Sequence, residues 1–233
     1  THLSGTGIGD LGDVALLPVV SDNERQTTID RGTEKCVPGF YTVVTGDGVK
    51  VELTATSHAG LHRYTFPNGR TPQLRLDLKQ GIGWDKMYDS HFTQLSPTVI
   101  TGYRYSSGWA KDQRVYFYAE FNRPVSMTRQ EGDSVAYMRA TDNNGEAIMA
   151  RVGISATSID EARANLNKEL LSWNLEQVRE QADKQWDKEL GRVRIETTNA
   201  DNRAIFYTAL YHTMTAPSEI KKVKAEFKSS NSS

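Results

Sequence analysis

From about residue 14 to residue 155, short β-branched and apolar stretches alternate with turn-forming residues. Residues 40–45 and 49–56 are two such stretches, and the Gly46-Asp47-Gly48 segment between them is typical of a β-hairpin. Residues 74–78 alternate between leucine and a charged residue, which predicts a strand with one buried face.

Two further strand pairs are predicted, 99–105 with 114–121 and 136–141 with 147–155, the second joined across Asp142-Asn-Asn-Gly145. Helical spacing is not seen between any of these strands. Consecutive strands without intervening helices are typical of an antiparallel β-sandwich, and we expect that fold for this part of the chain.

After residue 156 the pattern becomes helical. Ser158 and Glu161 form a capping box before a first helix, and a second helix is expected from near Asn174 to Gly191, its predicted C-cap. A third helix, about 200–214, is apolar around most of its circumference. Such a helix needs neighbours on several sides, and the residues after it are rich in lysine and serine. We therefore expect it to begin a truncated helical domain, with packing against the sandwich as the alternative.

The composition excludes several classes of protein. The 233 residues carry a net charge of −1, which argues against a nucleic-acid-binding protein. No apolar run approaches the ~20 residues that a membrane-spanning helix needs. The single cysteine, Cys36, excludes an internal disulfide framework and a cysteine-rich zinc site.

Candidate chemistry is sparse. Residues 7–12 match the GxGxxG pattern, but no helix follows to hold a pyrophosphate, so a tight glycine loop is the favoured interpretation. Asp10 and Asp13 could form an acid–base pair, yet side chains that stabilise the turn are favoured. The five histidines show no metal-binding spacing. Most aromatic residues are expected in the core, with Trp84 and Trp109 the better candidates for exposure.

Several segments together resemble one known family, the α-mannosidases of glycoside hydrolase family 92. The resemblance covers about residues 1–218 in order. It is carried by the loop His2-Leu-Ser-Gly-Thr-Gly-Ile-Gly-Asp-Leu-Gly-Asp13, by residues 100–110 and 115–121, by 152–155 and 186–191, and by the helix 205–214.

The resemblance implies a β-sandwich at 1–156, a helical linker at 157–191 and the first helix of an (α/α)6 barrel within 192–218, followed by a polar tail at 219–233. It also implies an exported, calcium-dependent exo-α-mannosidase that acts with inversion, often on α-1,2-linked mannose of N-glycans. The family's acid, base and calcium ligands lie in the barrel, so no catalytic or metal-binding residue is assigned to this chain, which alone is expected to be inactive.

In such an enzyme the sandwich would cap the barrel, its missing intramolecular partner, and complete the cleft for a mannose-containing oligosaccharide. The candidate substrate-binding residues are His2, Ser4, Thr6 and Asp10, because a glycine-rich polar loop can approach a sugar closely. The alternative for this loop is docking against a preceding segment. The alternative for the whole chain is a non-catalytic carbohydrate-binding or domain-docking β-sandwich, with Trp84 or Trp109 in contact with the ligand.

Overall fold

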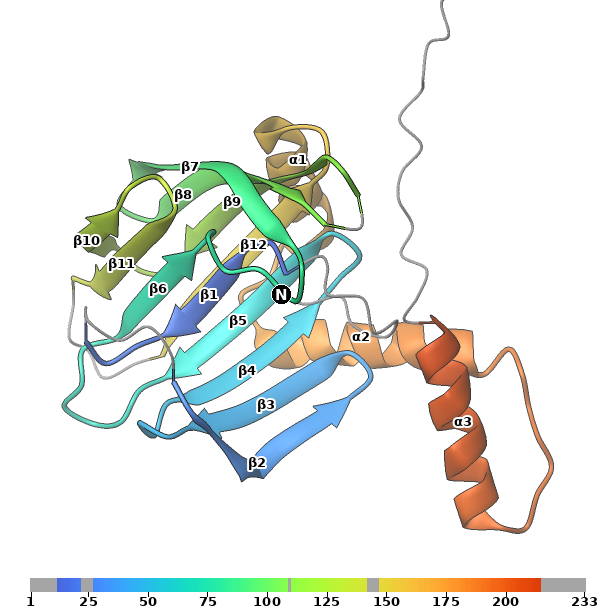
Figure 1. The fold of residues 1–233 in the computed structure, drawn as a ribbon. Coiled ribbons are helices and arrows are strands. Elements are labelled where there is room, and N and C mark those ends of the chain that lie inside the picture. The colour runs from blue at the N-terminus through green and yellow to red at the C-terminus, as the bar shows by residue number, and fades with distance from the viewer. Residues whose placement is uncertain (1–11, 22–26, 109, 142–146, 215–233) are drawn as a thin grey trace, which may run out of the picture.

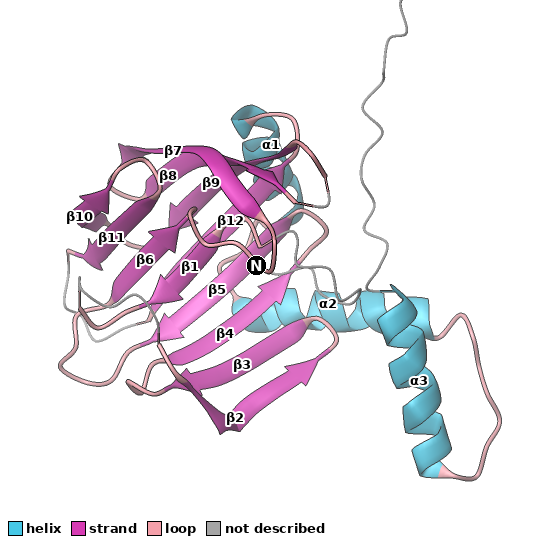
Figure 2. Ribbon diagram, viewed as in Figure 1, coloured by secondary structure: helices cyan, strands magenta, loops and turns pink. Residues whose placement is uncertain are grey.

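The computed structural model describes residues 12–21, 27–108, 110–141 and 147–214. In these ranges two antiparallel sheets face each other and three helices follow in sequence (Figures 1 and 2). The strand order is β1-β6-β11-β10 in the smaller sheet and β2-β3-β4-β5-β12-β9-β8-β7 in the larger sheet. This arrangement confirms the predicted antiparallel sandwich followed by helices.

The strands of the smaller sheet are β1 (Ala15–Pro18), β6 (Gln73–Asp77), β10 (Val125–Glu131) and β11 (Val135–Ala140). Those of the larger sheet are β2 (Ile29–Val37), β3 (Phe40–Thr45), β4 (Lys50–Ala55), β5 (Ala59–Thr65), β7 (Lys86–Ser96), β8 (Val99–Ser107), β9 (Gln113–Phe121) and β12 (Ile148–Ser155).

The main hydrophobic core lies between the two sheets. Leu74 and Leu76 point into it from β6, and Ile100, Phe117 and Ile148 point into it from the larger sheet, each at most 3% exposed. Side chains on opposite faces of a strand alternate, so the residues between these positions are directed away from this core. Burial of apolar surface between the sheets is the main stabilising contribution to the sandwich.

Strand β6 departs from its prediction. The alternation of leucine with charge predicts one exposed face, yet both faces are buried, and Arg75 and Asp77 are only 7% and 5% exposed. Their side chains form an ion pair of 2.6 Å, and the Arg75 guanidinium lies 5.8 Å from the ring centroid of Tyr137 on the neighbouring strand β11. Charged residues therefore fill a buried face here because they neutralise each other locally.

The expected hairpin of 136–141 with 147–155 is wrong. Strand β11 pairs with β6 and β10 in the smaller sheet, whereas β12 pairs with β5 and β9 in the larger sheet. The two strands are consecutive in sequence but belong to opposite layers. The segment Asp142–Gly145 between them lies outside the described residues. A local turn signal shows that the chain reverses direction, but it does not identify the sheet in which the next strand pairs.

Helix α1 (Ile159–Glu169) covers the outer face of the larger sheet. The Oγ of Ser158 accepts a hydrogen bond of 3.1 Å from the Glu161 N–H, as the capping box predicts. Leu166 is fully buried against the sheet. The helix approaches β12 so closely that a Cβ on Gly153 would overlap the Ala162 carbonyl oxygen, so only glycine fits this position without a shift of the helix.

Helix α2 (Leu175–Leu190) begins at Asn174, whose Oδ1 accepts a hydrogen bond of 3.0 Å from Gln177 N–H, and it ends at Gly191. Its buried residues are Leu175, Val178 and Ala182. The first two extend the cluster formed by α1 and the sheet.

Helix α3 (Ala200–Met214) has no buried residue in the described structure. It is connected to α2 by the edge-to-face contact of Tyr211 with Trp186, at 4.8 Å between ring centroids, and Tyr207 donates a hydrogen bond to the Val193 carbonyl. Ile205 is 67% exposed. The alternative in which this helix packs against the sandwich is therefore wrong for the described chain (Figure 1).

Candidate functional site

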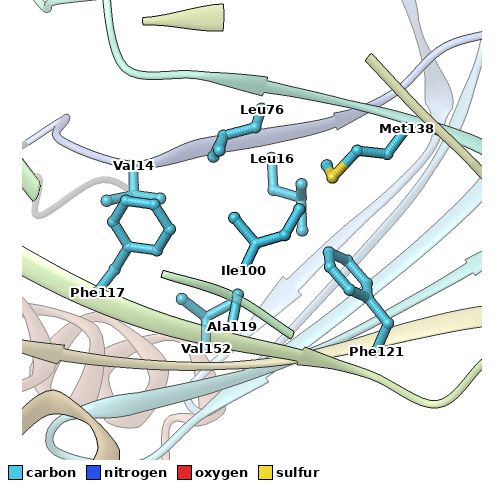
Figure 3. A pocket seen from close by; sticks show the side chains of 9 residues that line it. All are labelled: Val14, Leu16, Leu76, Ile100, Phe117, Ala119, Phe121, Met138 and Val152. Carbon is cyan, nitrogen blue, oxygen red and sulfur yellow. The ribbon is translucent and has the colours of Figure 1, made fainter. Parts of the chain in front are cut away.

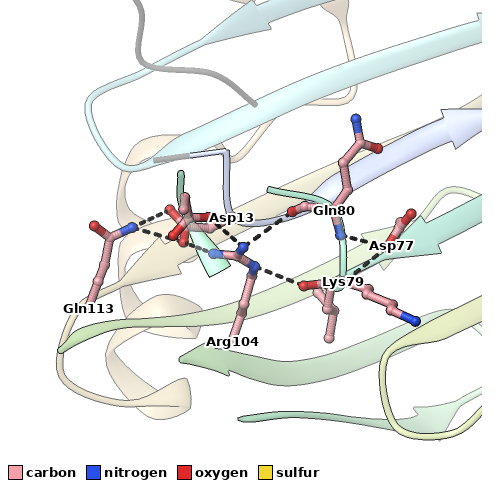
Figure 4. A network of polar contacts seen from close by, with 8 residues as sticks. Asp13, Asp77, Lys79, Gln80, Arg104 and Gln113 are labelled. Carbon is pink, nitrogen blue, oxygen red and sulfur yellow. Dashed lines mark hydrogen bonds and ion pairs between the residues drawn. The ribbon is translucent and has the colours of Figure 1, made fainter. Parts of the chain in front are cut away.

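A buried ion cluster lies at the end of the sandwich where residues 12–14 enter the fold. Its centre is Arg104 on β8, which points between the sheets and is fully buried. The guanidinium donates to Asp13 Oδ1 at 2.8 Å (Figure 4) and to Asp85 Oδ2 at 2.5 Å. It also donates to the carbonyl oxygens of Leu78 and Gln80, at 2.8 and 3.2 Å. One side chain thus connects three segments that are far apart in sequence.

Asp13 has a second partner in this cluster. The Gln113 amide donates to its Oδ1 at 2.9 Å and to its Oδ2 at 3.0 Å. Burial raises the pKa of the Asp13 carboxyl, and the hydrogen bonds from Gln113 and Arg104 act in the opposite direction. The described partners of Asp13 are a strand arginine and a strand glutamine about one hundred residues away, whereas residues 1–11 of its own turn lie outside the described residues, so its role in that turn stays a prediction.

The cluster holds two carboxylates against one guanidinium in a region closed to solvent. Asp85 is 5% exposed, and its Oδ1 has no hydrogen-bond partner among the described residues. Such a cluster stabilises the fold only while every charge keeps its partner, because an unpaired buried charge is strongly unfavourable. Arg104 therefore holds together the segments that meet at this end of the sandwich.

The neighbouring backbone is equally constrained. A Cβ on Gly12 would lie 2.5 Å from Cδ1 of Ile82, so residue 12 lies directly against the segment that leads to Asp85. Asp77 Oδ1 accepts hydrogen bonds from the backbone N–H groups of Lys79 and Gln80, at 2.8 and 3.0 Å, and orders the start of that segment (Figure 4). These contacts fix the chain at the point where it follows residues 1–11.

The predicted substrate-binding residues His2, Ser4, Thr6 and Asp10 lie outside the described residues. Their contact with a sugar stays a prediction. Trp109 also lies outside them, whereas Trp84 is described and is 53% exposed, as expected from its position beside Gly83.

Two of the described histidines, His58 and His62, contact acidic or hydroxyl side chains. Nδ1 of His58 lies 2.6 Å from Glu169 Oε1, a contact that joins the loop before β5 to α1. Nδ1 of His62 lies 2.8 Å from the Tyr64 hydroxyl, and burial lowers the pKa of His62 to about 3. Within the described ranges, no three His, Cys, Asp or Glu side chains are grouped so that they could hold a metal ion.

The void found between the two sheets in the described part of the chain is too small for a sugar. It has a volume of about 10 Å³ and is lined by apolar side chains that include Val14, Ile100 and Met138 (Figure 3). This volume is about that of one water molecule, and the lining carries no polar group to hydrogen-bond a hydroxyl. As to membranes, none of the described helices is long and apolar enough to span one.

Comparison with known proteins extends this picture. The α-mannosidase of family GH92 from Bacteroides thetaiotaomicron superposes with a TM-score of 0.80 at 28% identity, over 91% of this chain and 33% of its own length. That enzyme has also been solved in complex with mannoimidazole. An inverting mannosidase of the same family and species has a TM-score of 0.72 at 25% identity, over 88% of this chain and 29% of its own.

A curated relative, an uncharacterized secreted glycosidase of Arthroderma benhamiae, is 24% identical over 266 residues, which cover 94% of this chain and 34% of the relative. The chain thus spans about a third of the length of the relatives it matches. The model of the glycosyl hydrolase family 92 N-terminal domain matches residues 1–155, and that of the family's catalytic domain matches residues 161–233. The chain therefore belongs to glycosyl hydrolase family 92.

Proposed function

We propose that this chain forms the sandwich, the linker and the first catalytic-domain helix of an exported, calcium-dependent exo-α-mannosidase. In this proposal residues 1–156 are the sandwich domain, 157–191 the helical linker and 192–218 the start of an (α/α)6 barrel. The substrate is the terminal α-1,2-linked mannose of an oligosaccharide such as an N-glycan. The observation that carries the proposal is the superposition on a GH92 α-mannosidase over 91% of the chain.

In this proposal the sandwich contributes substrate contacts and the barrel contributes the chemistry. The buried cluster of Asp13, Arg104 and Asp85 would hold the end of the loop that carries His2, Ser4, Thr6 and Asp10, so that the loop could complete the cleft. In an inverting hydrolysis one carboxylic acid protonates the leaving oxygen while a carboxylate activates water on the opposite face of the ring. We place both groups in the barrel and assign neither to a residue of this chain.

Calcium is proposed for the same part of the protein. The described residues offer no group of three or more His, Cys, Asp or Glu side chains that could hold a metal, and calcium needs six to eight oxygen ligands. The described part of the chain therefore does not fit a calcium site of its own, and we derive no step through the ion.

Export is supported by the secreted glycosidase of Arthroderma benhamiae. It is tested by finding the protein in the periplasm, on the cell surface or in the medium of cells that produce it.

The test of activity uses a longer protein, in which this chain continues into a complete catalytic domain. Sequencing the DNA on both sides of the coding region gives the sequence from which that protein is expressed. We expect this protein to release mannose from α-1,2-mannobiose, and proton NMR to show β-mannose as the first product. Chelation should abolish the release, and added calcium should restore it.

The 233-residue chain alone should release no mannose. Within the longer protein, Asp10→Asn should reduce kcat/KM, with Asp47→Asn on an exposed turn as the control. Release of α-mannose first, or full activity after chelation, would contradict the proposal.

A further inference from the structure

Four tyrosines gather on the outer face of the larger sheet, and we call them the tyrosine surface. Tyr88 is on β7, Tyr103 and Tyr105 are on β8, and Tyr116 is on β9. Tyr103 and Tyr105 flank the inward-pointing Arg104, so strand alternation directs both rings away from the core. None of the four is buried, and Tyr88 is 54% exposed. The expectation that most aromatic residues lie in the core does not hold for these four.

The rings of the tyrosine surface order one another. Tyr103 and Tyr105 stack with their centroids 4.5 Å apart, and Tyr116 meets Tyr105 edge to face at 5.8 Å. Tyr88 lies 6.2 Å from Tyr105 across the strand pair. Mutually packed rings lose little rotamer freedom when a ligand binds, so the surface is organised before binding.

Polar groups border the rings in a fixed arrangement. The Tyr88 hydroxyl donates to Asp112 Oδ1 at 2.6 Å, and Arg114 donates to both oxygens of Asp112 at 3.1 Å. The Arg114 guanidinium also lies 5.1 Å from the centroid of the Tyr105 ring. The hydrogen bond with Tyr116, together with burial, raises the pKa of Tyr105 to about 12.

This combination matches the chemistry of a sugar ring. A pyranose presents a C–H face that packs on aromatic rings and hydroxyl groups that pair with carboxylates, guanidinium groups and phenols. The Asp112–Arg114 pair is charge-balanced, which favours a neutral ligand over a polyanion such as a nucleic acid. Four partly exposed rings also supply less area than the ~800 Å² per partner of a stable protein interface. We propose that the tyrosine surface is a non-catalytic binding site for a neutral pyranose oligosaccharide.

The tyrosine surface shares its ligand class with the proposed function but uses different residues from the predicted substrate loop. Binding at the tyrosine surface would keep a glycan chain attached to the protein whether or not the chain is hydrolysed. Its ligand class rests on the proposed function, whereas its location rests on the described contacts. The experiment must therefore measure binding without catalysis.

The test is affinity electrophoresis of the 233-residue chain in native gels that contain yeast α-mannan. We expect mannan to retard the wild-type chain and Tyr88→Ala to weaken the binding at least ~10-fold, because the most exposed ring and its hydrogen bond to Asp112 are lost. Tyr88→Phe, which keeps the ring, should lose less. Leu95→Ala is the matched control, since Leu95 is 60% exposed on the same strand, and its binding should equal that of the wild type. Circular dichroism establishes that each variant is folded.

Three results would overturn the inference. The first is that mannan does not retard the wild-type chain, and the second is that it retards Tyr88→Ala as much as the wild type. The third is that Trp84→Ala loses its retardation by mannan while Tyr88→Ala keeps it. A fourth result comes from the longer protein with its catalytic domain. If Tyr88→Ala there abolishes hydrolysis of α-1,2-mannobiose, the surface is a domain interface rather than an auxiliary site. If that protein hydrolyses mannobiose but the chain does not bind mannan, this inference fails and the proposed function stands.

Discussion

Two regions of the molecule can be compared: the sandwich together with α1, and helix α3. Both contain apolar residues, but these residues are buried in the first region and not in the second. In the first region Leu61, Leu166 and Leu170 are at most 1% exposed, and they pack across the boundary between sheet and helix. In α3 no residue is buried. An apolar helix lowers the free energy of folding only where neighbours cover it, so the difference indicates that the neighbours needed to bury α3 are not among the described residues. The match of residues 161–233 to a catalytic-domain model is consistent with this conclusion.

The strongest test of the sandwich side of this comparison is Arg104→Met. The replacement keeps most of the volume but leaves Asp13 and Asp85 without their guanidinium partner in a buried region. We expect a loss of about 3–5 kcal/mol in the free energy of unfolding, measured by urea denaturation followed by circular dichroism. A loss below about 1 kcal/mol would show that water enters the cluster and solvates both carboxylates.

Removal of one buried leucine tests the interface between α1 and the sheet. Leu166→Ala should cost about 2–5 kcal/mol, because Leu166 is fully buried and the fold cannot collapse completely around the cavity. Leu171→Ala provides the control, since Leu171 is 77% exposed shortly after the same helix and should change the stability by less than about 0.5 kcal/mol. Equal effects of the two substitutions would contradict the described packing of α1.

A pH-dependent contribution comes from Glu169 at the end of α1. Burial opposes its ionisation, but hydrogen bonds from His58 and Thr56 to the carboxylate hold the pKa of Glu169 below its ordinary value. A lowered folded-state pKa gives stability that is present above the unfolded-state pKa of about 4.3 and is lost as the pH falls through the folded-state value.

Glu169→Gln should therefore cost about 1–2 kcal/mol at pH 7. Below the ordinary pKa of glutamate, the difference between the variant and the wild type should shrink. Urea denaturation at a series of pH values measures both quantities. A difference that is the same at pH 7 and pH 3 would exclude this role for the charge of Glu169.

The smallest effect on stability is expected in α3. Ile205→Ser replaces a residue that is 67% exposed, so the unfolding free energy should change by less than about 0.5 kcal/mol. Binding of a hydrophobic dye should nevertheless fall, because part of the exposed apolar surface is gone. In a protein that contains the complete catalytic domain, the same substitution should be strongly destabilising. Equal stability losses in both contexts would remove the contrast between α3 and the sandwich.

Local features of this fold are predictable from sequence, and long-range ones are not. The hairpin of β3 and β4, the capping box at Ser158 and the start of the second helix near Asn174 depend on residues a few positions apart, and all three predictions are confirmed. The pairing of β12 with β5 and β9 depends on strands far away in sequence, and the local turn signal predicted a different partner.

The candidate site shows the same limit. Asp13 and Arg104 are 91 residues apart, so no spacing rule connects them. The outward orientation of Tyr103 and Tyr105 could have been inferred from their alternation with Arg104 only if that arginine had been known to point inward. A substrate-binding role for the loop at residues 2–10 is implied by the family resemblance alone, because the glycine spacing indicates only a tight turn.

The position of β12 has a consequence for biosynthesis. It is the last strand of the larger sheet to be made, yet it lies in the middle, between β5 and β9. During translation at about 5–20 residues per second, the meander of β2–β5 and that of β7–β9 must wait with unpaired edges until residues 148–155 leave the ribosome. Closure of the sheet by this last strand makes its folding slow and non-local, and it makes the two waiting edges the points at which a nascent chain is most exposed to misassembly.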